Sequence, residues 1–232
     1  MTNLLRRLLR RARRVMNRGS KPSSYALPMT YPNVVKLMYF ERMLGTVRDL
    51  EGDVVECGVG HGKSLFMLAC LLKEERKNRK LWGFDSFQGF PTPSPQDASL
   101  RNPKKGEWGD TSLELINELI SSGKLDQAFI LSNLSLIPGF FSESLSKYRG
   151  AGIALLHIDA DLYASYIDVL RELYPKVIPG GMVILDEYLG VEHLKYPGPY
   201  QAIEAFFEGK GPTIQRDAPT GKFYFIKPAV AT

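Results

Sequence analysis

Four acidic residues in the second half of the chain could form one site. Each pair follows a short apolar stretch: Asp159 and Asp161 follow the first, and Asp186 and Glu187 follow the next. If these stretches are neighbouring parallel strands, the carboxylates meet at the carboxyl edge of a sheet, where open α/β sheets bind ligands. Carboxylates this close repel one another unless protons or a cation intervene. Oxygen ligands without a matching histidine or cysteine set favour Mg²⁺, with Mn²⁺ or Ca²⁺ as alternatives.

A glycine-rich turn is the second candidate for chemistry. Residues 56–64 read ECGVGHGKS, after a predicted strand and before a predicted helix. A P-loop is disfavoured because Cys57 stands where its first glycine belongs, and a dinucleotide fingerprint fails because Lys63 replaces its third glycine. The pattern acidic-x-Gly-x-Gly-x-Gly remains, which is the first motif of S-adenosylmethionine-dependent methyltransferases. In that motif the carboxylate, here Glu56, faces the amino-acid part of the cofactor.

Asp85 is the natural partner of this turn. It ends the second predicted strand, 29 residues after Glu56. A carboxylate there can accept hydrogen bonds from both ribose hydroxyls, because its two oxygens match two vicinal donors. The alternative role is a capping or turn aspartate, which the pairing with the glycine turn disfavours.

Short β-branched runs alternate with amphipathic stretches, which predicts a doubly wound, Rossmann-like α/β sheet of the class I methyltransferase type. The sheet is expected to be mostly parallel and to end in an antiparallel hairpin, because only five residues separate the last two runs. A polar loop of about twenty residues, 90–110, is expected to act as a lid. The predicted helices are 34–47, 63–76, 111–121, 163–173 and 200–207, and the predicted strands are 53–57, 81–85, 128–131, 153–158, 182–186, 213–216 and 222–226.

The net charge of +5 is unevenly distributed. Eight of the 30 Lys and Arg residues lie in residues 1–21, so the remaining 22 face all 25 acidic residues. We predict a basic amphipathic arm and linker over residues 1–28, and a catalytic domain over 29–232. The arm suits an anionic membrane surface, an acidic partner, organelle targeting or subunit packing. Without a membrane-spanning run or a secretory signal, we expect a cytoplasmic protein, with peripheral membrane contact through the arm.

These motifs together resemble the macrocin O-methyltransferase (TylF-type) family, which methylates sugar hydroxyls on macrolides and other natural products. The resemblance spans about residues 29–227. The segments that carry it are 29–30, 56–64, 85–91, 138–141, 159–165, 173–188, 197–198, 201–206 and 221–227. With the motifs above, it implies that S-adenosylmethionine is bound by Met29, Thr30, Glu56, Gly58, Gly60, Ser64, Asp85 and Ser86.

The resemblance also implies a Mg²⁺ site and a proton acceptor. Asp159, Asp186 and Glu187 are the implied metal ligands, with Glu187 in place of the usual second aspartate. Asp159, or secondarily Asp161, is expected to take the proton from the acceptor hydroxyl, because Leu162 stands where some relatives carry a histidine base. The implied acceptor is a hydroxyl of a sugar, a glycosylated small molecule or a glycan. The arm and the helix before the first strand are candidate subunit contacts for a homo-oligomer.

Three other functions compete with this interpretation. One is a metal-independent small-molecule methyltransferase, and another is a non-catalytic S-adenosylmethionine-binding protein tethered by its arm. A nucleic-acid methyltransferase is disfavoured, because the basic excess belongs to the arm and not to the folded body. Among the histidines, we expect His157 to be a core residue and His61 to be structural. His193 is a weak candidate for the base.

Overall fold

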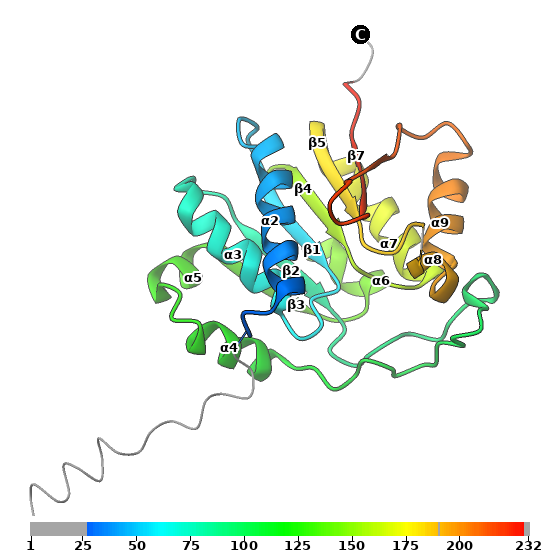
Figure 1. The fold of residues 1–232 in the computed structure, drawn as a ribbon, viewed down its shortest axis with the longest axis horizontal. Helices are drawn as coiled ribbons and strands as arrows, with labels where there is room; N and C mark the ends of the chain where they lie inside the picture. Colours follow the sequence, from blue (N-terminus) through cyan, green and yellow to red (C-terminus); the bar gives the residue numbers. More distant parts are fainter. Residues whose placement is uncertain (1–26, 190, 230–232) are drawn as a thin grey trace, which may run out of the picture.

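The sheet organises the protein. The computed structural model describes residues 27–189 and 191–229 (Figure 1). The strands are β1 (Asp53–Cys57), β2 (Leu81–Asp85), β3 (Leu134–Pro138), β4 (Ile153–Ile158), β5 (Val177–Leu185), β6 (Gln215–Arg216) and β7 (Phe223–Ile226). The helices are α2 (Tyr31–Thr46), α3 (Lys63–Glu75), α4 (Leu113–Ser122), α5 (Gln127–Asn133), α6 (Phe141–Ser144), α7 (Tyr163–Leu173), α8 (Val191–Lys195) and α9 (Gly198–Phe207).

Within the described part of the chain, seven strands form one sheet in the order β3-β2-β1-β4-β5-β7-β6. The strands from β3 to β5 in this order run parallel, whereas β7 pairs antiparallel with β5, and β6 with β7. β1 and β4 are buried along their whole length, as expected for strands covered on both faces. The predicted doubly wound sheet with a C-terminal antiparallel hairpin is therefore confirmed.

Helices cover both faces of the sheet (Figure 1). Side chains of α2, α3 and α4 form one core with one face of the sheet, and side chains of α7 and α9 form a second core with the other face. Alternation along a strand explains this division. Val54 packs into the first core, whereas its neighbour Val55 packs into the second. The two cores fix the strands whose ends carry the predicted site residues.

One predicted strand is wrong. Residues 128–131 belong to helix α5, and the strand lies just beyond, as β3. The helix starts there because the carboxylate of Asp126 accepts a hydrogen bond from the Ala128 backbone N–H at 2.9 Å, which caps its N-terminus. A four-residue apolar run does not distinguish helix from strand by periodicity. The short helices α6 and α8 were also not predicted, and β5 begins five residues earlier than expected.

The loop over residues 90–110 is fastened to the helices beside it. The buried carboxylate of Asp97 accepts hydrogen bonds from the Tyr163 N–H at 2.7 Å and from the Ser94 N–H at 2.7 Å. Tyr163 is the first residue of α7, so the loop is attached where that helix begins. Gln201 of α9 adds a hydrogen bond to the Gln96 carbonyl at 2.9 Å. Whether the loop moves as a lid stays a prediction.

The predicted arm over residues 1–21 lies outside the described residues, as does its linker up to residue 26. Among the residues that the structure describes, no helix has the length and apolar character needed to cross a membrane.

Candidate active site

A cavity of about 1060 Å³ lies at the carboxyl edge of the parallel strands. The glycine turn forms one part of its wall, and the four predicted acidic residues form another. The loop of residues 90–110 and the start of α6 complete the wall, with aromatic side chains such as Phe90, Trp108 and Phe141. The topology therefore places both sequence-predicted groups in one cavity, as expected at the switch point of a doubly wound sheet.

The glycine turn and Asp85 are hydrogen-bonded to each other. The carboxylate of Asp85 accepts from the Gly60 N–H at 2.8 Å and from the Phe87 N–H at 2.7 Å. Gly58 has a φ of +96°, and a Cβ added there would lie 1.7 Å from the carbonyl oxygen of Asp159. This position therefore requires glycine, because a side chain would push the Asp159 backbone away from the turn.

The predicted cofactor residues divide into two groups. Five of them line the cavity: Gly58, Gly60, Ser64, Asp85 and Ser86. The other three, Met29, Thr30 and Glu56, are not among its lining residues. Met29, two residues before α2, is 90% exposed, whereas Glu56 is fully buried. The register of β1 and β4 sets Glu56 opposite His157, so its carboxylate faces the imidazole.

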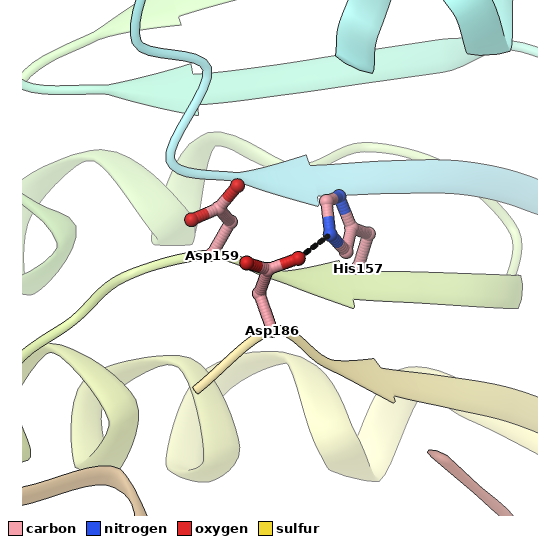
Figure 2. Close-up of side chains that lie close together, drawn as sticks. All are labelled: His157, Asp159 and Asp186. Atoms are coloured by element: carbon pink, nitrogen blue, oxygen red, sulfur yellow. Dashed lines mark ion pairs between the residues drawn. The ribbon is translucent and has the colours of Figure 1, made fainter. Parts of the chain in front are cut away.

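His157 belongs to the acidic cluster. Its side chain, with those of Asp159 and Asp186, offers ligand atoms that all lie within 4.8 Å of one another (Figure 2). His157 Nε2 lies 3.7 Å from Asp186 Oδ1, and Nδ1 lies 3.0 Å from Glu56 Oε1. The histidine is buried, as predicted, but it faces a site and not only the core. The sequence does contain a signal for this position. His157 and Asp159 are two residues apart along an extended segment, which places their side chains on the same side of the chain.

Two lysines that were not predicted as site residues reach the cluster. Lys222 Nζ lies 2.6 Å from Asp186 Oδ2, and it also donates to the main-chain oxygen of Asp186 at 3.0 Å. Lys36 Nζ, from α2, lies 3.8 Å from Asp159 Oδ2. Lys222 reaches Asp186 because β7 pairs with β5, with Phe223 opposite Leu185. The carboxylates are thus partly neutralised by side chains from distant parts of the chain.

The carboxyl groups of the cluster have pKa values shifted in opposite directions. Burial would raise the pKa of Asp186, but three neighbouring cationic side chains outweigh burial and hold it well below the usual range. Burial and the Asp186 charge raise the pKa of Asp159. Burial alone would lower the pKa of His157, but the adjacent Asp186 and Glu56 carboxylates raise it to about 9. One carboxylate is therefore strongly anionic, and its neighbour Asp159 has the raised pKa that suits a general base.

Asp161 and Glu187 lie beside these residues and also line the cavity. Glu187 Oε2 accepts a hydrogen bond from the Tyr166 hydroxyl at 3.0 Å and a longer one from the Asp161 N–H at 3.4 Å. Asp161 has a φ of +58°, a left-handed conformation that costs a non-glycine residue roughly 1–2 kcal/mol. Burial, with the charge of Asp159, raises the pKa of both carboxyl groups well above the usual range. Both residues line the cavity, but neither is among the three that converge in Figure 2.

The other two histidines lie apart from this cluster. His61 lines the cavity and pairs with Asp110, with Nε2 3.4 Å from Oδ2. His193 packs edge-on against Tyr200, with 5.3 Å between ring centroids, and is not a lining residue of the cavity. The described geometry therefore offers no direct role in the cavity for His193.

The family model for macrocin-O-methyltransferase (TylF) matches residues 17–210. The mycinamicin III 3''-O-methyltransferase of Micromonospora griseorubida is 32% identical over 68% of this chain and 67% of its own length. A tetracenomycin 4'-O-methyltransferase of Streptomyces olivaceus, which acts on an 8-demethyl-8-(2,3-dimethoxy-α-L-rhamnosyl) derivative, is 30% identical. That match covers 59% of this chain and 53% of the relative, so the chain spans only about half of that protein.

The fold agrees with these sequence matches. The solved structure of the O-methyltransferase NovP superposes with a TM-score of 0.69 at 25% identity, over 84% of this chain and 81% of that one. CalS11, a calicheamicin methyltransferase, superposes with a TM-score of 0.74 at 23% identity, over 85% and 80% of the two chains. The family match covers most of the chain, including the glycine turn and the acidic cluster. The chain belongs to the macrocin O-methyltransferase (TylF) family of O-methyltransferases.

Proposed function

We propose that this protein uses S-adenosylmethionine to methylate a hydroxyl of a sugar or a glycosylated small molecule, with the help of a divalent cation. One observation carries the proposal. The glycine turn with Asp85 and the cluster of Asp159 and Asp186 open into the same cavity. A methyl donor and an acceptor hydroxyl could therefore meet there. The rhamnosyl substrate in the name of the Streptomyces olivaceus relative supports a sugar acceptor.

The cofactor half of the cavity is formed by the turn and Asp85. Each oxygen of the Asp85 carboxylate accepts one backbone hydrogen bond and retains a further lone pair for a ribose hydroxyl. Gly60 leaves open space, since an added Cβ there would meet nothing within 4 Å. Ser64, in the first turn of α3, adds a lining hydroxyl close to the free N–H groups of the helix end. This arrangement suits the adenosine and amino-acid parts of S-adenosylmethionine.

The residues present fit a divalent cation. Nε2 of His157 is buried without a hydrogen-bond partner among the described residues, and it faces Asp186. Glu56 accepts from Nδ1, which is the hydrogen-bonding arrangement that orients a metal-ligating histidine. We propose Asp159, Asp186 and His157 as ligands for Mg²⁺ or Mn²⁺, with the cation displacing the proton on His157 Nε2 and with Glu187 as a fourth candidate. When bound, such a cation polarises the acceptor hydroxyl and lowers its pKa.

The chain's own groups then perform the proton transfer and the alignment. Asp159 lines the cavity and has a raised pKa, so we propose that it accepts the hydroxyl proton. Asp161 is the second candidate, held in position by its left-handed backbone. The aromatic walls at Phe90, Trp108 and Phe141 would hold the acceptor and exclude water. Methyl transfer requires the acceptor oxygen in line with the donor methyl, so this positioning lowers the barrier.

A metal-independent methyltransferase is the second candidate. The ammonium groups of Lys222 and Lys36 already neutralise part of the cluster, which is the specific observation in its favour. In that case the carboxylates would bind and orient the acceptor, and Asp159 would act as base without a cation.

The decisive experiment combines binding and turnover. Calorimetry should show S-adenosylmethionine binding that Asp85→Asn weakens by about tenfold or more, because a charged acceptor of the ribose hydroxyls is lost. Asp49→Asn, at an exposed position, serves as the control. Acceptor screening by mass spectrometry, with added Mg²⁺ or after chelation, then separates the two candidates. Turnover that survives exhaustive chelation would select the metal-independent enzyme, and absent cofactor binding would reject both.

A further inference from the structure

The backbone of Lys222 is anchored to the hairpin, whereas its side chain is held only at its ammonium end. The main-chain oxygen of Lys222 accepts from the Asp217 N–H at 2.8 Å, and the Asp217 carboxylate pairs with Arg42 of α2 at 2.9 Å. The hairpin before β7 is therefore tied to α2. The side chain of Lys222 is 28% exposed, so its flexible four-carbon stem has a route toward solvent. Only the ammonium end is held by the cluster, through Asp186.

Asp186 has two different neighbours on its two oxygens. Oδ2 accepts from the Lys222 ammonium at 2.6 Å, whereas Oδ1 faces His157 Nε2 at 3.7 Å, beyond hydrogen-bonding distance. That Nε2 is fully buried and has no partner among the residues described. This buried nitrogen without a partner supports a ligand site independently of the cluster's negative charge, because it faces the Asp186 carboxylate. The Lys222 ammonium therefore occupies Oδ2 of Asp186, whereas the neighbouring Nε2 of His157 has no partner among the described residues.

We infer that the ammonium of Lys222 and a divalent cation compete for Asp186. Lys222 acts as a built-in counter-cation that neutralises Asp186 when no metal is present and withdraws from Oδ2 when a metal binds. This inference rests on the metal site proposed above. The physical reason is that the three ligand atoms lie within 4.8 Å of one another, so a metal among them would repel an ammonium held 2.6 Å from Oδ2.

Lys36 provides the contrast within the same cluster. Its ammonium, on a side chain from α2, lies 3.8 Å from Asp159 Oδ2, which is an ion pair without a short hydrogen bond. Lys36 can therefore stay beside a metal at a lower cost than Lys222. We expect the competition to be specific to Lys222, because its ammonium hydrogen-bonds the carboxylate of a proposed ligand.

The test measures Mn²⁺ binding to the full chain by calorimetry or by the electron paramagnetic resonance of free Mn²⁺. Lys222→Met is expected to bind Mn²⁺ roughly ten- to a hundredfold more tightly than wild type, because a nearby like charge is removed. Lys222→Gln, which keeps a polar side chain, should show the same direction and covers the case in which methionine disturbs folding. Lys210→Met removes an equal charge from an exposed position after α9 and should leave the Kd unchanged.

Thermal unfolding supplies a second measurement. Without metal, Lys222→Met leaves the Asp186 carboxylate with less compensation, so its Tm should fall below that of wild type. Saturating Mn²⁺ should then raise the Tm of the variant by more than it raises that of wild type.

The two proposals fail in different ways. Equal or weaker Mn²⁺ binding by folded Lys222 variants, with wild type binding normally, would overturn the competition and leave the metal site standing. Absence of Mn²⁺ binding in wild type and in both variants would overturn the metal site and the competition together. In that case S-adenosylmethionine binding and methyl transfer would still report separately on the enzyme.

Discussion

Glu56 and His157 face each other across the pair of β1 and β4, with the carboxylate Oε1 3.0 Å from the imidazole Nδ1. Both side chains are fully buried. An ionised carboxylate only accepts hydrogen bonds, so Nδ1 donates and Nε2 is turned toward Asp186. The acidic residue of the glycine motif therefore orients a histidine of the neighbouring strand toward the acidic cluster.

Glu56→Gln tests this relationship. The isosteric amide keeps the shape but removes the charge that orients the imidazole, so Mn²⁺ affinity should fall by about ten- to a hundredfold. S-adenosylmethionine affinity should stay unchanged, since Glu56 is not a lining residue of the cavity. Calorimetry of both ligands measures the two effects, with the exposed Glu51→Gln as control. A loss confined to S-adenosylmethionine would instead assign Glu56 to the cofactor, as the motif alone suggests.

Gly58→Ala and Gly60→Ala form a matched pair. Both glycines have positive φ, but a Cβ at Gly58 would meet the Asp159 carbonyl oxygen at 1.7 Å, whereas one at Gly60 would meet nothing within 4 Å. The first substitution should cost about 3 kcal/mol or more, from overpacking added to strain. The second should cost only about 1 kcal/mol, from strain alone. Urea unfolding measures both, and equal costs would contradict the close approach of Gly58 and Asp159.

The parts of the site that could be predicted are those formed by short local motifs in the sequence. The glycine turn, Asp85 and the acidic pairs follow strand ends, and the carboxyl ends of parallel strands must share an edge of the sheet. His157 could also have been recognised, because alternation places it on the same side of the chain as Asp159. The sequence alone favours a core role because His157 lies inside an apolar run, and strand β4 is buried along its whole length.

The two lysines could not be predicted in the same way. Lys222 reaches Asp186 through the register of β7 on β5, and Lys36 reaches Asp159 through the packing of α2. Neither contact leaves a local pattern in the sequence. The incorrect strand at residues 128–131 has a related cause, since the cap at Asp126 determined the outcome for an apolar run that suited either structure.

Asp217 should make stability depend on acid pH. Burial would raise its pKa, but hydrogen bonds from Thr220 and Arg42 outweigh burial and lower it. A carboxyl group with a lowered folded-state pKa stabilises the protein above its unfolded pKa of about 4, and this contribution disappears as the pH falls through the folded-state pKa. The stability difference between wild type and Asp217→Asn should therefore be constant from about pH 5 to pH 7 and shrink below about pH 4. Urea titrations across this range measure it. An equal difference at every pH would show that Asp217 does not titrate with folding.

Asp97 should control the loop over residues 90–110. Its Oδ1 accepts from the Tyr163 N–H, and its Oδ2 accepts from the Ser94 N–H and hydroxyl. Asp97→Asn must turn its NH₂ group toward one of these N–H donors, because an amide has only one acceptor oxygen. A buried donor left unsatisfied costs roughly 1–3 kcal/mol. The negative charge at the N-terminus of α7 is lost as well.

The loop should consequently open more often in Asp97→Asn. Hydrogen exchange of residues 90–110 should accelerate, and the KM for the acceptor should rise more than kcat falls, because this loop forms part of the cavity wall. Asp49→Asn, the same chemical change at an exposed position outside this loop, is the control. Gly198 lies so close to this junction that an added Cβ would fall 2.0 Å from Asp97 Oδ1, so Gly198→Ala should reproduce the faster exchange. Unchanged exchange in both variants would mean that the loop is held by its aromatic contacts, such as Phe90 against Tyr196, and not by Asp97.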